Sequence, residues 1–117
     1  MPRETNPNFM AGVPELMLLR LLQDREMYGY EIVQAIRTET GDVISLGEGV
    51  VYTVLHALER EGALKSRRRS VAGRSRIYYA VTATGLRRYR DLAKTWTTLA
   101  GAVRSVMEGG DHATATR

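Results

Sequence analysis

The chain has 117 residues, of which 44% are hydrophobic and 26% charged, which predicts one small folded domain and excludes wholesale disorder. It has no cysteine and two distant histidines, His56 and His112, which excludes disulfide scaffolds, thiol nucleophiles and multi-histidine metal sites. We therefore expect no enzyme activity and no cofactor. No apolar run is long enough to span a membrane and the first residues lack a signal-peptide pattern, so a cytoplasmic protein is expected.

The distribution of charge is more informative than its total of +4. Residues 1–64 contain five basic and ten acidic side chains, whereas residues 65–117 contain twelve basic and three acidic ones. The segment from Lys65 to Arg76 alone has six basic residues and no acid. Such a run is often an ordinary solvated loop, but its charges repel one another. We favour binding to an anion such as DNA phosphate, because an anion relieves that repulsion.

Three helices are predicted before the basic segment. The first, residues 14–24, is apolar nearly all round and is expected to be buried on most sides as the central helix of the core. The second, residues 28–41, has one apolar face. The third, residues 45–62, starts with Ser45 and Glu48 at the spacing of a capping box.

Projection of the third helix at 100° per residue separates an apolar face from a face of small and polar residues. The inward residues are Val51, Val54, Leu55 and Leu58; the outward ones are Gly49, Thr53, His56 and Arg60, with Tyr52 on the flank. The outward face can approach DNA bases closely. For two of these residues a structural role stays open as the alternative to a DNA contact. His56 is equally well an ordinary exposed helix residue, and Tyr52 can be an aromatic residue at the edge of the core.

After the third helix the apolar period changes from 3.6 to 2, which predicts a β-hairpin. The first strand begins at Leu64, residues 71–75 form a turn with a basic tip, and a second strand follows. In that second strand, Ile77, Tyr79 and Val81 are expected to form the half-buried face.

The final helix is too long for the domain that precedes it. Thr82 can cap a helix from Ala83 to Met107, about 37 Å at 1.5 Å per residue. A 4-3-4-3-4 spacing of apolar residues continues to its end: Tyr89, Ala93, Trp96, Ala100, Val103 and Met107. Packing on the first helix accounts for the start of this stripe, and for its distal half we expect a two-fold homodimer.

Three helices followed by a hairpin predict a winged helix-turn-helix, mainly α with a small β-hairpin, plus a long C-terminal dimerisation helix. The expected parts are 1–82, an N-terminal arm and DNA-binding domain, 83–108, the dimerisation helix, and 109–117, a disordered tail. In this fold the third helix enters the major groove and the hairpin reaches the flanking backbone. The candidate DNA-binding residues are Tyr30, Gly49, Tyr52, Thr53, His56, Arg67, Arg68, Arg69, Arg74 and Arg76.

Four groups of residues together are typical of one known family: Tyr28-Gly29-Tyr30-Glu31-Ile32, Gly49-Val50-Val51-Tyr52 with Leu55, Leu58, Glu59, Glu61 and Gly62, Arg76-Ile77-Tyr78-Tyr79, and Thr82 with Gly85. On these residues the chain, over residues 13–108, resembles the PadR family of transcriptional regulators. The resemblance implies a homodimeric winged-helix protein that binds a double-stranded DNA operator, most often a repressor and sometimes released by a small molecule. The single C-terminal helix is similar to that of the family's short subgroup. Thr53 departs from the family, which usually has proline at this position.

Trp96 lies in the stripe between the small residues Ala93 and Ala100. It either fills the core of the dimer or, as in some similar proteins, walls a cleft with its symmetry mate for a flat aromatic or apolar effector. An alternative function is that of a winged-helix adaptor without DNA binding, whose basic hairpin meets an acidic protein. Salt dependence of binding to duplex DNA distinguishes the two functions.

Overall fold

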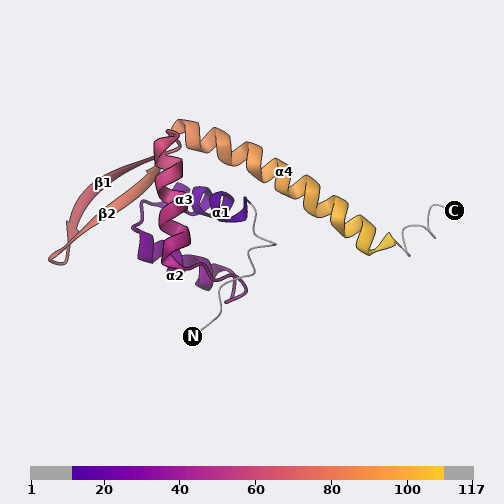
Figure 1. Cartoon of the computed structure of the whole chain (residues 1–117), viewed down its shortest axis with the longest axis horizontal. Coiled ribbons are helices and arrows are strands. Elements are labelled where there is room, and N and C mark those ends of the chain that lie inside the picture. The colour runs from indigo at the N-terminus through magenta and orange to yellow at the C-terminus, as the bar shows by residue number, and fades with distance from the viewer. Residues whose placement is uncertain (1–11, 110–117) are drawn as a thin grey trace.

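The computed structural model describes residues 12–109. Within that range the elements are α1 (Val13–Asp24), α2 (Gly29–Glu39), α3 (Glu48–Arg60), β1 (Leu64–Val71), β2 (Arg74–Val81) and α4 (Ala83–Met107). This is the predicted mainly helical fold with one antiparallel hairpin, and α4 extends away from the domain on the side opposite the hairpin (Figure 1). The predicted arm and tail, apart from Gly12 and Gly109, lie outside the described residues.

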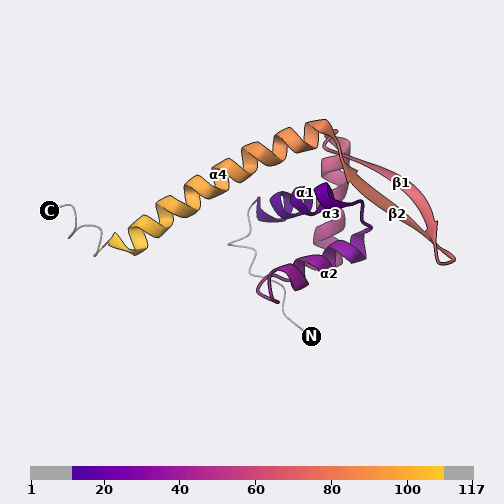
Figure 2. The same ribbon diagram turned by 180° about the vertical axis from the view of Figure 1, so that it is seen from behind.

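The first three helices pack around one core, and both α1 and α3 contact the hairpin (Figure 2). Its fully buried side chains come from all three helices and are Leu18, Leu19, Ile32, Ile36, Val51, Leu55 and Leu58. The prediction that α1 is buried on most sides is wrong, because Leu16, Met17 and Leu21 remain partly exposed. The side of α1 that carries these three residues faces the open space beside α4.

The turn between α2 and α3 differs from the predicted one. The prediction of a capping box at Ser45 and Glu48 is wrong, because α3 begins two residues later than expected, with Gly47 at its N-cap. Ser45 is buried in the turn before the helix. The hydroxyl of Thr40 organises the turn instead. It donates to the carbonyl of Ile36 at 2.7 Å and accepts from the backbone N–H of Ile44 at 3.0 Å.

The hairpin turn is shorter than predicted. Ala72 and Gly73, with φ of 52° and 78°, form a two-residue turn, and Val71 pairs directly with Arg74. Two consecutive positive φ angles match the right-handed twist of the strands, which lets the ladder run to the tip.

The predicted alternation of β2 is also wrong at its centre. Tyr78 and Tyr79 are both buried, whereas Ile77 is 36% exposed. The hairpin projects beyond the core, so Ile77 stays partly exposed at a groove, while on the other face Tyr28 and Arg69 cover Tyr78.

In the described part of the chain, α4 packs against the domain along its first half, where Tyr89 and Leu92 adjoin the core, and polar contacts fasten its start. The Thr82 hydroxyl accepts from the backbone N–H of Gly85 at 3.1 Å, as predicted for the cap, and donates to the carbonyl of Gly62 at 2.7 Å. Arg88 forms ion pairs with Glu15 of α1 and with Glu61 after α3. In the described part of the chain, α4 is the longest helix, and neither it nor any other helix combines the length and apolarity needed to cross a membrane.

Candidate nucleic-acid interface

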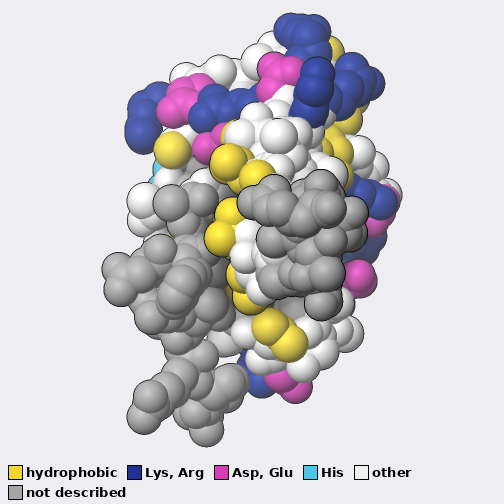
Figure 3. Space-filling model, turned by 90° about the vertical axis from the view of Figure 1, so that its right-hand side faces the viewer, with side chains coloured by type: hydrophobic (Ala, Val, Ile, Leu, Met, Phe, Trp, Pro, Cys, Tyr) yellow, Lys and Arg dark blue, Asp and Glu magenta, His cyan; other side chains and the backbone are white. Residues whose placement is uncertain are grey.

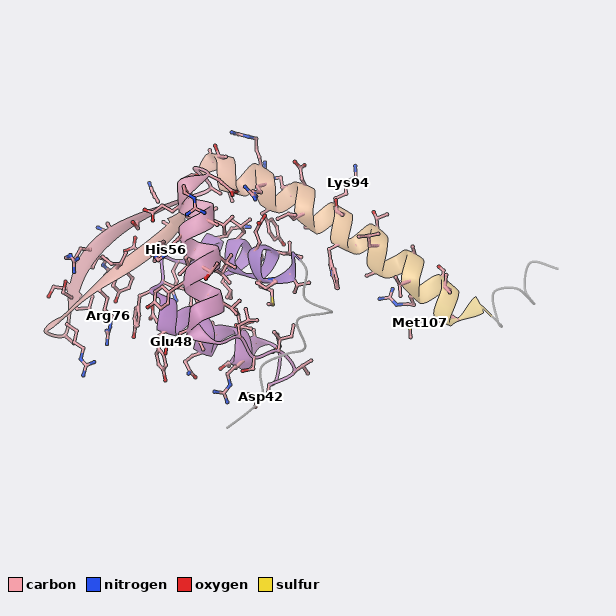
Figure 4. All side chains as sticks on the ribbon, viewed as in Figure 1. Asp42, Glu48, His56, Arg76, Lys94 and Met107 are labelled. Carbon is pink, nitrogen blue, oxygen red and sulfur yellow. The ribbon has the colours of Figure 1, made fainter. Side chains whose placement is uncertain are left out.

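A groove runs between the exposed flank of α3 and the hairpin. Its volume is about 680 Å³, and its lining residues are Tyr28, Tyr30, Glu48, Tyr52, His56, Arg68, Arg74, Ser75, Arg76, Ile77 and Tyr79. Three arginines and one carboxylate give the groove a positive charge. Figure 4 shows Glu48 and His56 on α3 and Arg76 on the hairpin around this space. Six of the predicted DNA-binding residues therefore meet here: Tyr30, Tyr52, His56, Arg68, Arg74 and Arg76.

Tyr52 is held in this groove by close packing on the start of α2. A Cβ added to Gly29 would lie 2.6 Å from Cζ and 2.7 Å from the hydroxyl oxygen of Tyr52. On its other side, the Tyr52 ring lies 6.1 Å from the His56 ring, centroid to centroid. Tyr52 is nevertheless 38% exposed, so it both packs and faces the groove.

The arginines of the hairpin divide into two sets. Arg68, Arg74 and Arg76 line the groove. Arg67 and Arg69 instead bind Glu26, which lies between α1 and α2. The Nε and one terminal nitrogen of Arg67 donate to its carboxylate, and a terminal nitrogen of Arg69 does so at 2.8 Å. The Arg67 guanidinium hydrogen-bonded to Glu26 holds the pKa of that carboxyl below its ordinary value.

An aromatic ladder fixes the hairpin against the same loop. The guanidinium of Arg69 lies 4.4 Å from the centre of the Tyr78 ring, which meets the edge of Tyr28 at 5.3 Å. Arg76 lies 4.3 Å over the opposite end of this pair, at Tyr28. Each of these contacts is a favourable cation–π or edge-to-face interaction. The sequence analysis missed Glu26 and this ladder, because every contact made by Glu26 or Tyr28 with the hairpin joins residues about forty to fifty positions apart.

Gly49 and Thr53 lie outside the groove, on the outward face of α3. A shallow hollow there is lined by Gly47, Gly49, Val50, Thr53 and Val54. The Thr53 hydroxyl donates to the carbonyl of Gly49 at 2.8 Å. A Cβ at Gly49 would meet nothing within 4 Å, so this face is open to a ligand.

The residues predicted for a dimer or effector surface lie along α4, from the part that packs on the domain to its C-terminal end. Tyr89 and Ala93 are partly buried, and beside them a hollow of about 350 Å³ opens between α1, the end of α2 and α4. Farther along, Trp96 is 50% exposed, Val103 58% and Met107 80%, and Ala100 lies between them. Figure 3, which faces this side of the molecule, shows hydrophobic side chains exposed beside Lys and Arg.

In the structure from residue 12 to residue 109, no three histidine or acidic side chains come together in a way that could hold a metal ion. The chemistry of the groove is that of hydrogen bonding and positive charge.

Comparisons with known proteins agree with this arrangement. The model of the transcriptional regulator PadR-like family matches residues 18–91. An uncharacterized protein of Lysinibacillus sphaericus is 29% identical over 103 residues, which are 87% of this chain and 94% of that protein. The structure of a transcriptional regulator from Clostridium thermocellum is similar at 26% identity, covering 86% of this chain and 96% of its own, with a TM-score of 0.79. A PadR family transcriptional regulator from Eggerthella lenta is similar at 25% identity, with 87% and 88% covered and a TM-score of 0.76.

Proposed function

The chain belongs to the transcriptional regulator PadR-like family, whose members are regulators and not enzymes, and from this we propose that it is a homodimeric, sequence-specific DNA-binding repressor. The groove between α3 and the hairpin carries this proposal, because it joins a helix that fits the major groove to a basic hairpin beside it. Residues 12–82 would bind DNA and α4 would dimerise. Such a dimer would repress where its site overlaps the polymerase-binding part of a promoter, because it then excludes the polymerase from that DNA.

The proposed contacts follow from the division of the arginines. Arg68, Arg74 and Arg76 form no ion pair with the described residues, so their charge is available to phosphates at the edge of the groove, whereas Arg67 and Arg69 would first have to leave Glu26. His56 and Tyr52 face the same space from α3. Phosphate contacts position a protein on the duplex, and contacts to base edges select the sequence.

The dimer is supported by the distal half of α4. Trp96, Leu99, Val103, Val106 and Met107 are between 50% and 81% exposed, and no described segment of the chain covers them. A helix with so much exposed apolar surface gains free energy by pairing with a second copy. A two-fold dimer also presents two copies of α3, which can enter successive major grooves about 34 Å apart.

A flat aromatic effector is supported by the hollow beside Trp96. Its lining is mostly apolar and includes Leu16, Met17, Leu21, Tyr89, Ala93 and Trp96. A ligand that prefers a dimer with differently spaced recognition helices would release DNA, because binding shifts the population towards that dimer.

The test is the salt dependence of binding to a short labelled duplex, measured by fluorescence anisotropy. Three phosphate contacts in each protomer give six per dimer, so the slope of log Kd against log salt should be about 5. Light scattering during gel filtration measures the dimer. A chain that binds no duplex at low salt but captures an acidic protein would instead support the adaptor, and a monomer would contradict the dimer.

A further inference from the structure

The outward face of α3 has an unusual chemistry for a helix that reads bases. The hydroxyl proton of Thr53 is already donated to the carbonyl of Gly49, at 2.8 Å. This bond leaves the side chain with a methyl group and oxygen lone pairs for outside contacts, but without a free donor. Thr53 is exposed, so the methyl group is available to a ligand.

The surroundings of Thr53 extend this uncharged surface. Val50, which is 39% exposed, lines the same hollow with Gly47, Gly49 and Val54, and no charged side chain contributes to it. At 100° per residue, Val50 and Tyr52 project about 160° apart on α3. One flank of the helix is therefore polar and faces the basic groove, while the other is apolar and faces away from it.

We propose that Val50 and Thr53 form a specificity subsite that recognises thymine by its 5-methyl group in the major groove of the operator. The C5 methyl group is the one apolar group that a base pair presents there, and it distinguishes T·A from the other pairs by van der Waals contact. The open space at Gly49 lets the base edge approach the helix. The two flanks belong to one helix, so a duplex whose backbone meets Arg68 and Arg74 on one side of α3 can present a base edge to the other side, which favours DNA over a protein as the occupant. This inference rests on the proposed function.

The experiment begins with a site enriched by the full-length chain from a random duplex library. Each thymine of that site is then replaced singly by uracil, which removes only the methyl group. We expect at least one position in each half-site where uracil raises the Kd by about fourfold, the effect of one buried methyl group. Salt dependence should not change, because no phosphate contact is lost.

Variants of Thr53 identify the protein group that meets this methyl group. Thr53→Ser removes the side-chain methyl but keeps the hydroxyl, so it should reduce the thymine-over-uracil ratio towards one at that position. Thr53→Val removes the hydroxyl but keeps a methyl, so it should preserve the ratio. Thr98→Ser, on the opposite side of α4 from Trp96, is the matched control. The Thr53→Ser and uracil changes form a double-mutant cycle, and the coupling is the measured quantity.

The outcomes separate the inference from the proposed function. An enriched site that is indifferent to uracil at every thymine overturns the inference and leaves the proposed function intact. An unchanged ratio in Thr53→Ser, or a ratio lost only in Thr53→Val, also overturns it, because the hydroxyl would then be the reader. Failure to enrich any site overturns the proposed function and the inference together.

Discussion

The Tyr52 ring lies directly against the backbone of Gly29. The space between them is too small for a methyl group, since a Cβ on Gly29 would come within 2.6 Å of the ring carbon that bears the hydroxyl. Gly29 is the first residue of α2, and Tyr52 lies in the second turn of α3. The contact therefore sets the distance between the two helices and the direction of a side chain that faces the groove between α3 and the hairpin. A change at either residue is therefore expected to affect both the packing of the helices and the shape of the groove.

Gly29→Ala should disturb both stability and binding. The added methyl group must displace Tyr52, and overpacking of this kind costs about 1–3 kcal/mol of unfolding free energy. Urea denaturation measures the loss, and anisotropy should show weaker DNA binding. Gly49→Ala is the stability control, because its Cβ would meet nothing within 4 Å. Equal stability of the two variants would contradict the tight contact. Tyr52→Phe, with unchanged DNA affinity, would assign the ring to packing alone.

Substitution of the hairpin arginines by alanine should change the slope of log Kd against log salt for one set of arginines and not for the other. Arg68→Ala and Arg74→Ala should each lower the slope by about one unit for every lost phosphate contact, or about two per dimer. Arg67→Ala should leave it almost unchanged, because Glu26 already neutralises this residue. The measurement is Kd over a series of salt concentrations on one duplex. An equal drop in Arg67→Ala would mean that the ion pair opens on DNA and that Arg67 contacts phosphate after all.

The helices and the hairpin were predictable from the sequence because they depend on local patterns. The heptad-like spacing in α4, the cap at Thr82 and the stop at Gly62 are all signals within a few residues. One failed prediction was also local. The spacing of Ser45 and Glu48 fits a capping box, but burial of Ser45 in the turn moves the start of α3 to Glu48.

The candidate site was predictable in its residue types and not in its arrangement. A run of arginines indicates an anion partner, but it does not reveal which arginines Glu26 binds. Alternation likewise placed Tyr79 inside, yet burial of Tyr78 depends on Tyr28, fifty positions earlier. Contacts between distant segments depend on how the elements pack, which no local period encodes.

Gly85→Ala should loosen the attachment of α4. A Cβ at Gly85 would lie 2.1 Å from the carbonyl oxygen of Ala63, which is backbone and cannot rotate away. We expect a loss of about 3 kcal/mol in unfolding free energy, at the upper end of the range for overpacking. Gly101→Ala, in the same helix with nothing within 4 Å, should gain about 0.5–1 kcal/mol from helix propensity. Similar denaturation midpoints for both variants would contradict this attachment.

The Glu26 ion pairs should make stability depend on pH in the acid range. The pKa of Glu26 is lowered in the folded chain, chiefly by its hydrogen bond to Arg67, so its contribution is present above the unfolded value of about 4.3. That contribution is lost as the pH falls through the lower folded pKa. Urea midpoints of the wild type and Glu26→Gln should therefore differ near neutral pH and converge in acid. Glu39→Gln, an exposed carboxylate on α2, is the control. A difference that persists in acid would contradict the role of the Glu26 charge.

Trp96→Ala should decide between a packed and an open dimer interface. Trp96 stands between two apolar hollows, one shared with Leu16 and Met17 of α1 and the other with Leu99 and Val103 of α4. If the partner subunit fills both hollows, truncation of the ring should weaken the dimer by about 3–5 kcal/mol, the range for aromatic residues in a core. If the hollow beside α1 stays open, little packing is lost and the dimer should survive. Light scattering over a dilution series measures the difference.

The same ring reports on the proposed effector, because Trp96 is the sole tryptophan of the chain. In an open dimer, planar aromatic carboxylates, whose negative charge keeps them from intercalating into duplex DNA, should stack on the exposed ring and quench its fluorescence. They should also weaken DNA binding of the wild type and leave that of Trp96→Ala unaffected, since the variant lacks the stacking surface. Leu99→Ala is a matched truncation on the same helix and should leave the quenching in place. A dimer that dissociates in Trp96→Ala, with no quenching by any planar compound, would assign Trp96 to the core of the interface and remove the effector from the proposed function.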